Sequence, residues 1–170
     1  MEQRKGILSC LNSFILIYEK HPTVSLKIAG EGDLLQEAKD FVTAHSLKNV
    51  EFLGKVNDDQ KWQLYRSSQV YLATAEYGES FGIVLVEAMS MGALLSGFAN
   101  DGYKMVLSNK QMEYFTAPKD IEGLVRRILK LLNLKPESIG DLRAEGAKIS
   151  KKYDWEILVE SVLEVYQESR

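Results

Sequence analysis

Short apolar segments of strand length alternate along this chain with segments in which apolar residues recur every three or four positions. This alternation constrains the fold more than any other feature, because strands that alternate with helices through short turns form right-handed βαβ crossovers. We therefore predict an α/β fold with a doubly wound parallel sheet that helices cover on both faces. Strands are expected at 24–29, 50–53, 70–73 and 93–95, with an edge strand at 112–115, and helices at 7–18, 33–45, 58–66, 81–92, 119–132, 136–151 and from 154 onward.

The composition excludes several classes of binding partner and of site. The 170 residues suffice for about one domain, and 45% of them are hydrophobic. The net charge is -3 with acidic and basic residues interspersed, so no basic surface for nucleic acid is expected. Cys10 is the only cysteine, which excludes an internal disulfide and a cysteine-cluster metal site, and no histidine spacing predicts a metal site. No apolar stretch is long enough to span a bilayer, and we expect a cytoplasmic location.

The segment 81–92 is ambiguous by propensity, because Ile83-Val84-Leu85-Val86 could equally form a buried strand. Strands are already required before it at Val70 and after it at Ala93. Gly92 is placed where a helix would end. The context therefore favours a helix.

Two acidic residues lie on either side of the apolar run Ile83-Val84-Leu85-Val86, Glu79 before it and Glu87 directly after it. Ionised carboxylates are costly to bury without a partner, so their position at the mouth of a crossover predicts a hydroxyl-rich ligand, for which a sugar ring and a ribose both qualify. The N–H groups of the first helical turn, next to Gly82, favour an anion such as a diphosphate. The alternative is that Glu79 only complements the helix dipole and that Glu87 is solvated.

The string from Gly78 to Met89 resembles the Glu-x7-Glu signature of retaining nucleotide-sugar glycosyltransferases of the GT-B fold, family 4, and is most similar to the phosphatidylinositol mannosyltransferases. The resemblance implies the Rossmann-like, donor-binding half of a GT-B fold. It implies a catalytic role for Glu79, at the hydroxyls of the donor sugar, and for Lys5, at the diphosphate. The nucleotide-sugar-binding residues that it implies are Gly30, Val56, Asp58, Lys61, Ser80, Phe81, Gly82, Ile83 and Glu87.

These residues have distinct implied roles. Glu87 would bind the ribose, with Ile83 at the border of the nucleoside and the backbone of 80–82 facing sugar and phosphate. The loop of Gly30 would pass near the base. The guanine nucleotide would be held by Val56, Asp58 and Lys61.

The resemblance extends over nearly the whole chain and predicts two parts, a Rossmann-like nucleotide-sugar-binding domain at 1–152 and a closing helix at 153–170. The chain begins almost directly with a helix, whereas a parallel βαβ series begins with a strand. We therefore expect the first strand of the sheet to be missing, together with an N-terminal acceptor-binding domain.

The function that follows is transfer of a hexose to an acceptor hydroxyl, either mannose from GDP-mannose or glucose from a UDP-sugar. No cofactor beyond this donor is expected, and the chain alone is expected to be inactive. A membrane surface would be reached only through the full-length enzyme. The alternative is a non-catalytic nucleotide-binding module or a degenerate half of a glycosyltransferase. A receiver-like signalling domain is disfavoured because the ends of the expected strands lack clustered acids.

Overall fold

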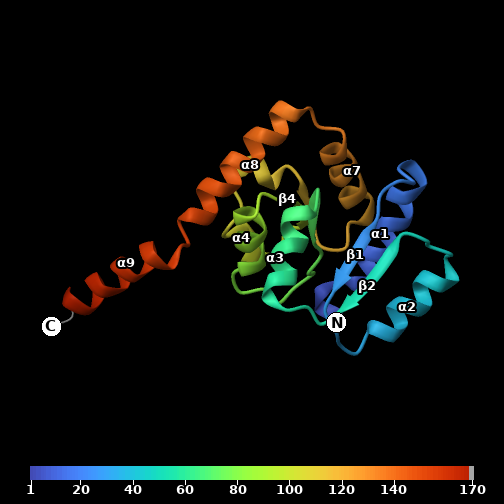
Figure 1. Cartoon of the computed structure of the whole chain (residues 1–170), viewed down its shortest axis with the longest axis horizontal. Coiled ribbons are helices and arrows are strands. Elements are labelled where there is room, and N and C mark those ends of the chain that lie inside the picture. Colours follow the sequence, from blue (N-terminus) through green and yellow to red (C-terminus); the bar gives the residue numbers. More distant parts are fainter. Residues whose placement is uncertain (169–170) are drawn as a thin grey trace.

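The strand pairs in the computed structural model, which describes residues 1–168, are all parallel (Figure 1). One ladder joins β1 (Leu26–Ala29) to β2 (Val50–Gly54). A second ladder has the order β3 (Val70–Ala73), β4 (Leu94–Phe98) and β5 (Phe115–Thr116). The predicted parallel α/β arrangement is confirmed.

Helices connect these strands in the predicted alternation, and Figure 1 shows the last of them extending away from the rest of the chain. Asp154 precedes this last helix, and its carboxylate accepts the N–H of Glu156 at 3.1 Å. The division of the chain at residue 153 stays a prediction. The helices are the short 3-10 helix η1 (Gln3–Lys5), α1 (Ile7–Lys20), α2 (Leu35–Ala44), α3 (Asp58–Ser67), α4 (Ile83–Ser90), α5 (Asp101–Lys104), α6 (Asn109–Met112), α7 (Ile121–Leu132), α8 (Pro136–Lys151) and α9 (Trp155–Glu168).

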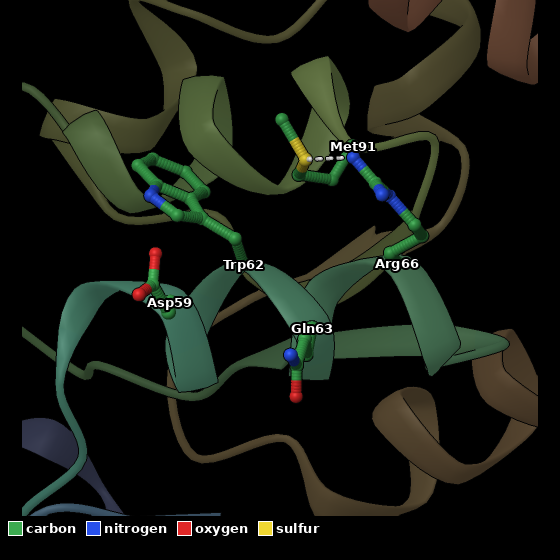
Figure 2. Close-up of a pocket in the computed structure, with 5 residues that line it drawn as sticks. All are labelled: Asp59, Trp62, Gln63, Arg66 and Met91. Atoms are coloured by element: carbon green, nitrogen blue, oxygen red, sulfur yellow. Dashed lines mark hydrogen bonds between the residues drawn. The ribbon is translucent and has the colours of Figure 1, made fainter.

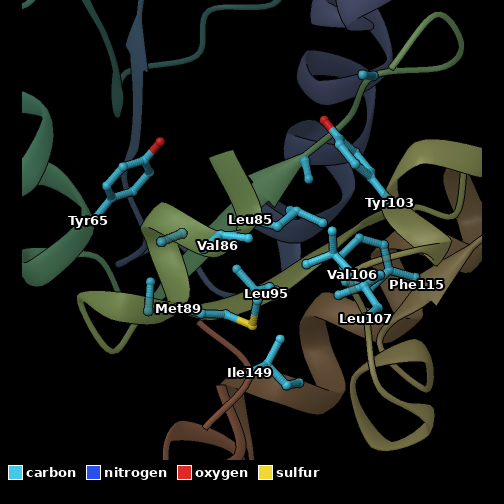
Figure 3. Close-up of a cluster of buried hydrophobic side chains, with 14 residues drawn as sticks. Tyr65, Leu85, Val86, Met89, Leu95, Tyr103, Val106, Leu107, Phe115 and Ile149 are labelled. Atoms are coloured by element: carbon cyan, nitrogen blue, oxygen red, sulfur yellow. The ribbon is translucent and has the colours of Figure 1, made fainter. Parts of the chain in front are cut away.

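Strand β4 is the best covered of the strands, because all five of its residues are buried. Side chains alternate between the two faces of a strand. Leu94 and Phe98 accordingly pack against α7 on one face, whereas Leu95 packs on the other face in a cluster with Met89 of α4 and Ile149 of α8 (Figure 3). Helices therefore cover both faces, as a doubly wound sheet requires.

The sheet is in two parts, since no ladder joins β1 to β3 within residues 1–168. Leu72 of β3 nevertheless packs against the cluster that contains Leu26 and Ile28 of β1. The two ladders thus adjoin at β1 and β3.

Helix α4 resolves the ambiguity of the segment 81–92 in favour of a helix. It buries Leu85 and Met89 among others and ends in a Schellman arrangement. The N–H of Gly92, at φ 78°, donates to the carbonyl of Met89, and the N–H of Ala93 donates to that of Ala88, both at 3.0 Å. The predicted stop at Gly92 is confirmed.

The predicted edge strand at 112–115 is wrong in its position. Residues Asn109–Met112 form the short helix α6, and only Phe115–Thr116 form a strand. A capping box causes the difference, because the Ser108 hydroxyl accepts the N–H of Gln111 while the Gln111 side chain accepts the N–H of Ser108. This local bonding stabilises a helical turn where apolar content alone indicated a strand.

The strand pair β3–β4 generates the first testable prediction. A Cβ at Gly97 would lie 2.1 Å from the carbonyl oxygen of Ala73, its partner in the ladder. We expect Gly97→Ala to lower the free energy of unfolding by about 2 to 3 kcal/mol in urea denaturation, because the strands must separate. Gly140→Ala, in α8 with no atom within 4 Å of the added Cβ, should instead raise it by about 0.5 to 1 kcal/mol. Equal effects of the two substitutions would contradict this packing.

The start of α4 generates the second prediction. Gly82 has φ 89°, and a Cβ there would lie 2.5 Å from the ring of Tyr103. Gly92 has a similar φ of 78°, with no atom within 4 Å of an added Cβ. We expect Gly92→Ala to cost about 1 kcal/mol through backbone strain alone. Gly82→Ala should cost about 1 to 3 kcal/mol more through the clash, and equal unfolding free energies of the two variants would exclude it.

Candidate functional site

The N-terminal residues lie against the loop that leads from β3 to α4. The N–H of Glu76 donates to the carbonyl of Arg4 at 2.8 Å, and the Thr74 hydroxyl donates to the carbonyl of Lys5 at 3.1 Å. Gly6, at φ 66°, allows this approach, since a Cβ there would lie 2.1 Å from the carbonyl oxygen of Thr74. Lys5 is therefore fixed beside the carboxyl end of β3.

Glu79 is the centre of the first charged cluster. Its side chain is 12% exposed, and its Oε1 accepts hydrogen bonds from the Arg4 guanidinium at 3.1 Å and from the Lys5 ammonium. Arg4 also donates to the carbonyl of Gly78 at 3.3 Å and pairs with Glu2 at 2.5 Å. The structure thus brings together the two residues that the sequence predicted as catalytic, with a second cation beside them.

Glu87 is the centre of the second cluster, which lies between α3 and α4. The Lys61 ammonium donates to Glu87 Oε1 at 3.0 Å, and the Tyr65 hydroxyl donates to Oε2 at 3.1 Å. Lys61 also pairs with Asp58 at 3.3 Å. The hydrogen bond to Glu87 is the main reason that the pKa of Lys61 is raised. The predicted residues Asp58, Lys61 and Glu87 therefore share one cluster.

The two acidic residues do not contact each other, but both lie within electrostatic range of Tyr71. Burial raises the pKa of the Tyr71 phenol to about 12, with the negative charge of Glu87 as the next contribution and a further one from Glu79. Tyr71 is on β3, which lies beside the site. The charges of both acids thus act on one side chain of β3.

The first turn of α4 separates the two clusters. No side chain caps this helix, and Ile83 at its start is 56% exposed. Ser80 is exposed as well. Phe81 instead packs edge-on against Tyr153, with ring centroids 5.1 Å apart. The N-terminus of the helix is accordingly open at Ser80 and Ile83 and anchored at Phe81.

Two predicted residues lie on neighbouring loops and are not joined by hydrogen bonds to the clusters in the part of the chain that the structure describes. Gly30 follows β1 with φ 118°, and a Cβ there would meet no atom within 4 Å. Val56 follows β2 and is half-buried. Their assignment to the nucleotide stays a prediction.

Sequence reasoning missed Arg4 and Tyr65. The basic pair Arg4-Lys5 was a signal for the first, since both side chains reach Glu79. The signal for the second was its spacing, because Tyr65 lies four residues after Lys61 and therefore on the same face of α3.

A surface hollow of about 420 Å³ lies next to the second cluster but is a different feature. Figure 2 shows it between α3 and the end of α4, where an Arg66 nitrogen lies 3.8 Å from the sulfur of Met91. It contains none of the predicted site residues. The residues that line it are Asp59, Trp62, Gln63, Arg66 and Met91.

The described residues also bear on metal binding and on membrane insertion. No three His, Cys, Asp or Glu side chains among them gather in a way that could hold a metal ion. None of the described helices combines the length and the apolar character needed to cross a membrane.

Comparisons with known proteins identify the family to which this chain belongs. The family model "Glycosyl transferases group 1" matches residues 1–153. The phosphatidyl-myo-inositol mannosyltransferase of Mycobacterium leprae is 31% identical over 169 residues, which are 98% of this chain and 44% of that protein. The chain therefore spans less than half the length of this curated relative.

Solved structures share the fold at lower identity. HepE of Anabaena, solved with UDP and glucose, superposes with a TM-score of 0.84 at 20% identity over 99% of this chain and 46% of that one. The catalytic domain of cholesterol-alpha-glucosyltransferase from Helicobacter pylori gives 0.77 at 20% identity over 90% and 93%. These likenesses show the GT-B fold. Because the family model covers most of its residues, the chain belongs to the group 1 glycosyl transferases.

Proposed function

We propose that this chain is the donor-binding half of a retaining glycosyltransferase, which moves a hexose from a nucleoside diphosphate to an acceptor hydroxyl. The observation that carries the proposal is the pair of acid–cation clusters on either side of the open N-terminus of α4. One cluster suits a sugar and a diphosphate, and the other suits a nucleoside. Membership in the family makes sugar transfer the chemistry to test.

The first cluster supplies groups for the leaving diphosphate. Lys5 and the free N–H groups at the start of α4 offer positive charge where negative charge develops as the sugar leaves. Glu79 would accept hydroxyls of the donor sugar. Lys5 would then turn from Glu79 toward the phosphates, while Arg4 keeps the carboxylate paired.

The second cluster supplies acceptors for a ribose. An ionised carboxylate offers about four lone-pair positions, of which Lys61 and Tyr65 occupy two at Glu87. The remaining positions suit the two neighbouring hydroxyls of a ribose. Asp58 and Lys61, with Val56 and the loop of Gly30, would hold the base.

The sugar and the base are proposed from relatives. The name of the mycobacterial relative favours mannose. GDP as its carrier is proposed from the family resemblance of the motif that contains Glu79 and Glu87. Anabaena HepE was solved with UDP and glucose, which makes a UDP-linked glucosyl donor the competing proposal. No further cofactor is part of either scheme.

The acceptor site is proposed to belong to a second, N-terminal domain, because the curated relative is more than twice as long as the matched part. The isolated chain would then bind the donor without transferring the sugar. We place the enzyme in the cytoplasm and expect it to reach a membrane surface, if its acceptor is a lipid, only through that second domain.

The proposal is tested first by calorimetric titration with GDP, UDP, GDP-mannose and UDP-glucose. We expect one nucleotide and its sugar conjugate to bind and the other pair to bind more weakly. Glu87→Ala should lower the affinity by about tenfold or more, because the ribose loses its acceptor. Glu122→Ala, at an exposed position on α7, is the matched control and should bind as the wild type does. Absence of binding by all four ligands would overturn the proposal.

The role of Lys5 has its own test. Lys5→Ala should weaken binding of the preferred nucleoside diphosphate by about tenfold and leave binding of the corresponding free nucleoside unchanged, because only the diphosphate contacts the ammonium. Lys148→Ala makes the same change of charge at an exposed position in the last turn of α8 and should affect neither ligand. An equal loss for nucleoside and diphosphate would show that Lys5 acts on the fold instead.

A further inference from the structure

Glu87 is held through both of its oxygens by two residues of different character. Lys61 donates to Oε1 at 3.0 Å, and Tyr65 donates to Oε2 at 3.1 Å. The two donors are one turn apart on α3, which packs against α4. The carboxylate therefore has its orientation fixed from one side, that of α3.

The Lys61 contact is the less constrained of the two. Its ammonium is shared with Asp58 at 3.3 Å and lies 4.6 Å from the centre of the Trp62 ring, and its side chain is 29% exposed. A lysine side chain also has several rotatable bonds. Lys61 alone would leave the plane of the Glu87 carboxylate free to turn.

Tyr65 is held rigidly by comparison. It is 6% exposed, and its ring meets that of Tyr71 edge-on at 5.2 Å and that of Trp62 at 6.1 Å. Burial raises the pKa of its phenol, so the hydroxyl keeps its proton at neutral pH and stays a donor. A fixed donor on Oε2 therefore sets how the carboxylate faces a ligand.

We propose that Tyr65 is a positioning residue for the recognition of a vicinal diol, acting through Glu87, so that the site prefers ribonucleotides over nucleotides without ribose hydroxyls. The inference rests on the proposed function, since it requires that Glu87 meets the ribose. Tyr65 itself does not contact the ligand. Its contribution appears only in interactions that use the Glu87 carboxylate.

The test compares two ligands on the whole 170-residue chain by calorimetry. One ligand is the preferred nucleoside diphosphate, GDP or UDP, and the other is its 2′,3′-dideoxy counterpart. Tyr65→Phe keeps the ring and removes the hydroxyl. We expect it to lower the affinity for the ribonucleotide about fivefold and to change that for the dideoxy ligand by less than about twofold. In a Glu87→Ala background it should produce no further change in the ratio of the two affinities.

A matched control separates this role from packing. Tyr114→Phe removes a hydroxyl from a similarly buried side chain, 7% exposed, in a different cluster. It should leave the ratio of affinities unchanged. A purely structural role of Tyr65 would weaken both ligands equally, and that result would overturn the inference.

The outcomes also distinguish this inference from the proposed function. If Glu87→Ala lowers the ribose preference and Tyr65→Phe does not, Tyr65 has no positioning role and the proposed function stands. If the wild-type chain binds neither nucleotide, or Glu87→Ala leaves the ratio of affinities unchanged, the proposed ribose site fails and the inference fails with it.

Discussion

The position of α4 depends on the backbone of Gly82. Its φ of 89° is a conformation that L side chains rarely adopt, and the absence of a Cβ leaves room for the buried ring of Tyr103. This turn sets the direction of the helix and, with it, the place of Glu87. It also ends the loop that carries Glu79. The positions of both acids therefore depend in part on the conformation of this residue.

Charge compensation is the second constraint on the site. The side chains of Glu79 and Glu87 are only 12% and 20% exposed, and each lies against cationic or hydroxyl donors that offset the cost of burying a carboxylate. The partners of Glu79 come from residues 74 and 75 positions earlier in the sequence, at the N-terminus. Those of Glu87 come from α3. Folding thus assembles the site from three separated segments, whose mutual placement depends on the packing of helices on the sheet.

Local patterns in the sequence predicted most of the fold. Gly92 and the neighbouring strands identified α4 as a helix in spite of its β-branched residues, because the strand positions on either side were already taken. Strand β5 was misplaced because the capping box at Ser108 and Gln111 depends on side-chain bonds that apolar periodicity does not report. The division of the sheet into two ladders, with none joining β1 to β3 in the described residues, depends on long-range pairing that no local pattern contains.

The candidate site could be predicted only in part, because local patterns do not report contacts between distant residues. Glu79, Glu87 and Lys5 carry recognisable sequence signals, and the structure pairs Lys5 with Glu79. Arg4 and Tyr65 were missed, because the neighbouring lysine and the helical spacing that mark them do not reveal which acid, 75 or 22 residues away, each one contacts. Such supporting residues lie outside any short motif.

The two clusters have the same arrangement of partners around each acid, and this arrangement affects how a donor would bind. Each acid has one lysine and one more constrained partner: Glu79 has Lys5 and an Arg4 that also bonds Gly78, and Glu87 has Lys61 and the buried Tyr65. Under the proposed function both lysines are needed by the ligand, one at the diphosphate and the other at the base. If a lysine moved from its acid to the ligand, the partly buried carboxylate would lose one cation, at a cost in free energy. The constrained partners reduce that cost, so the lysines can exchange an acid for a nucleotide while the acids stay in place.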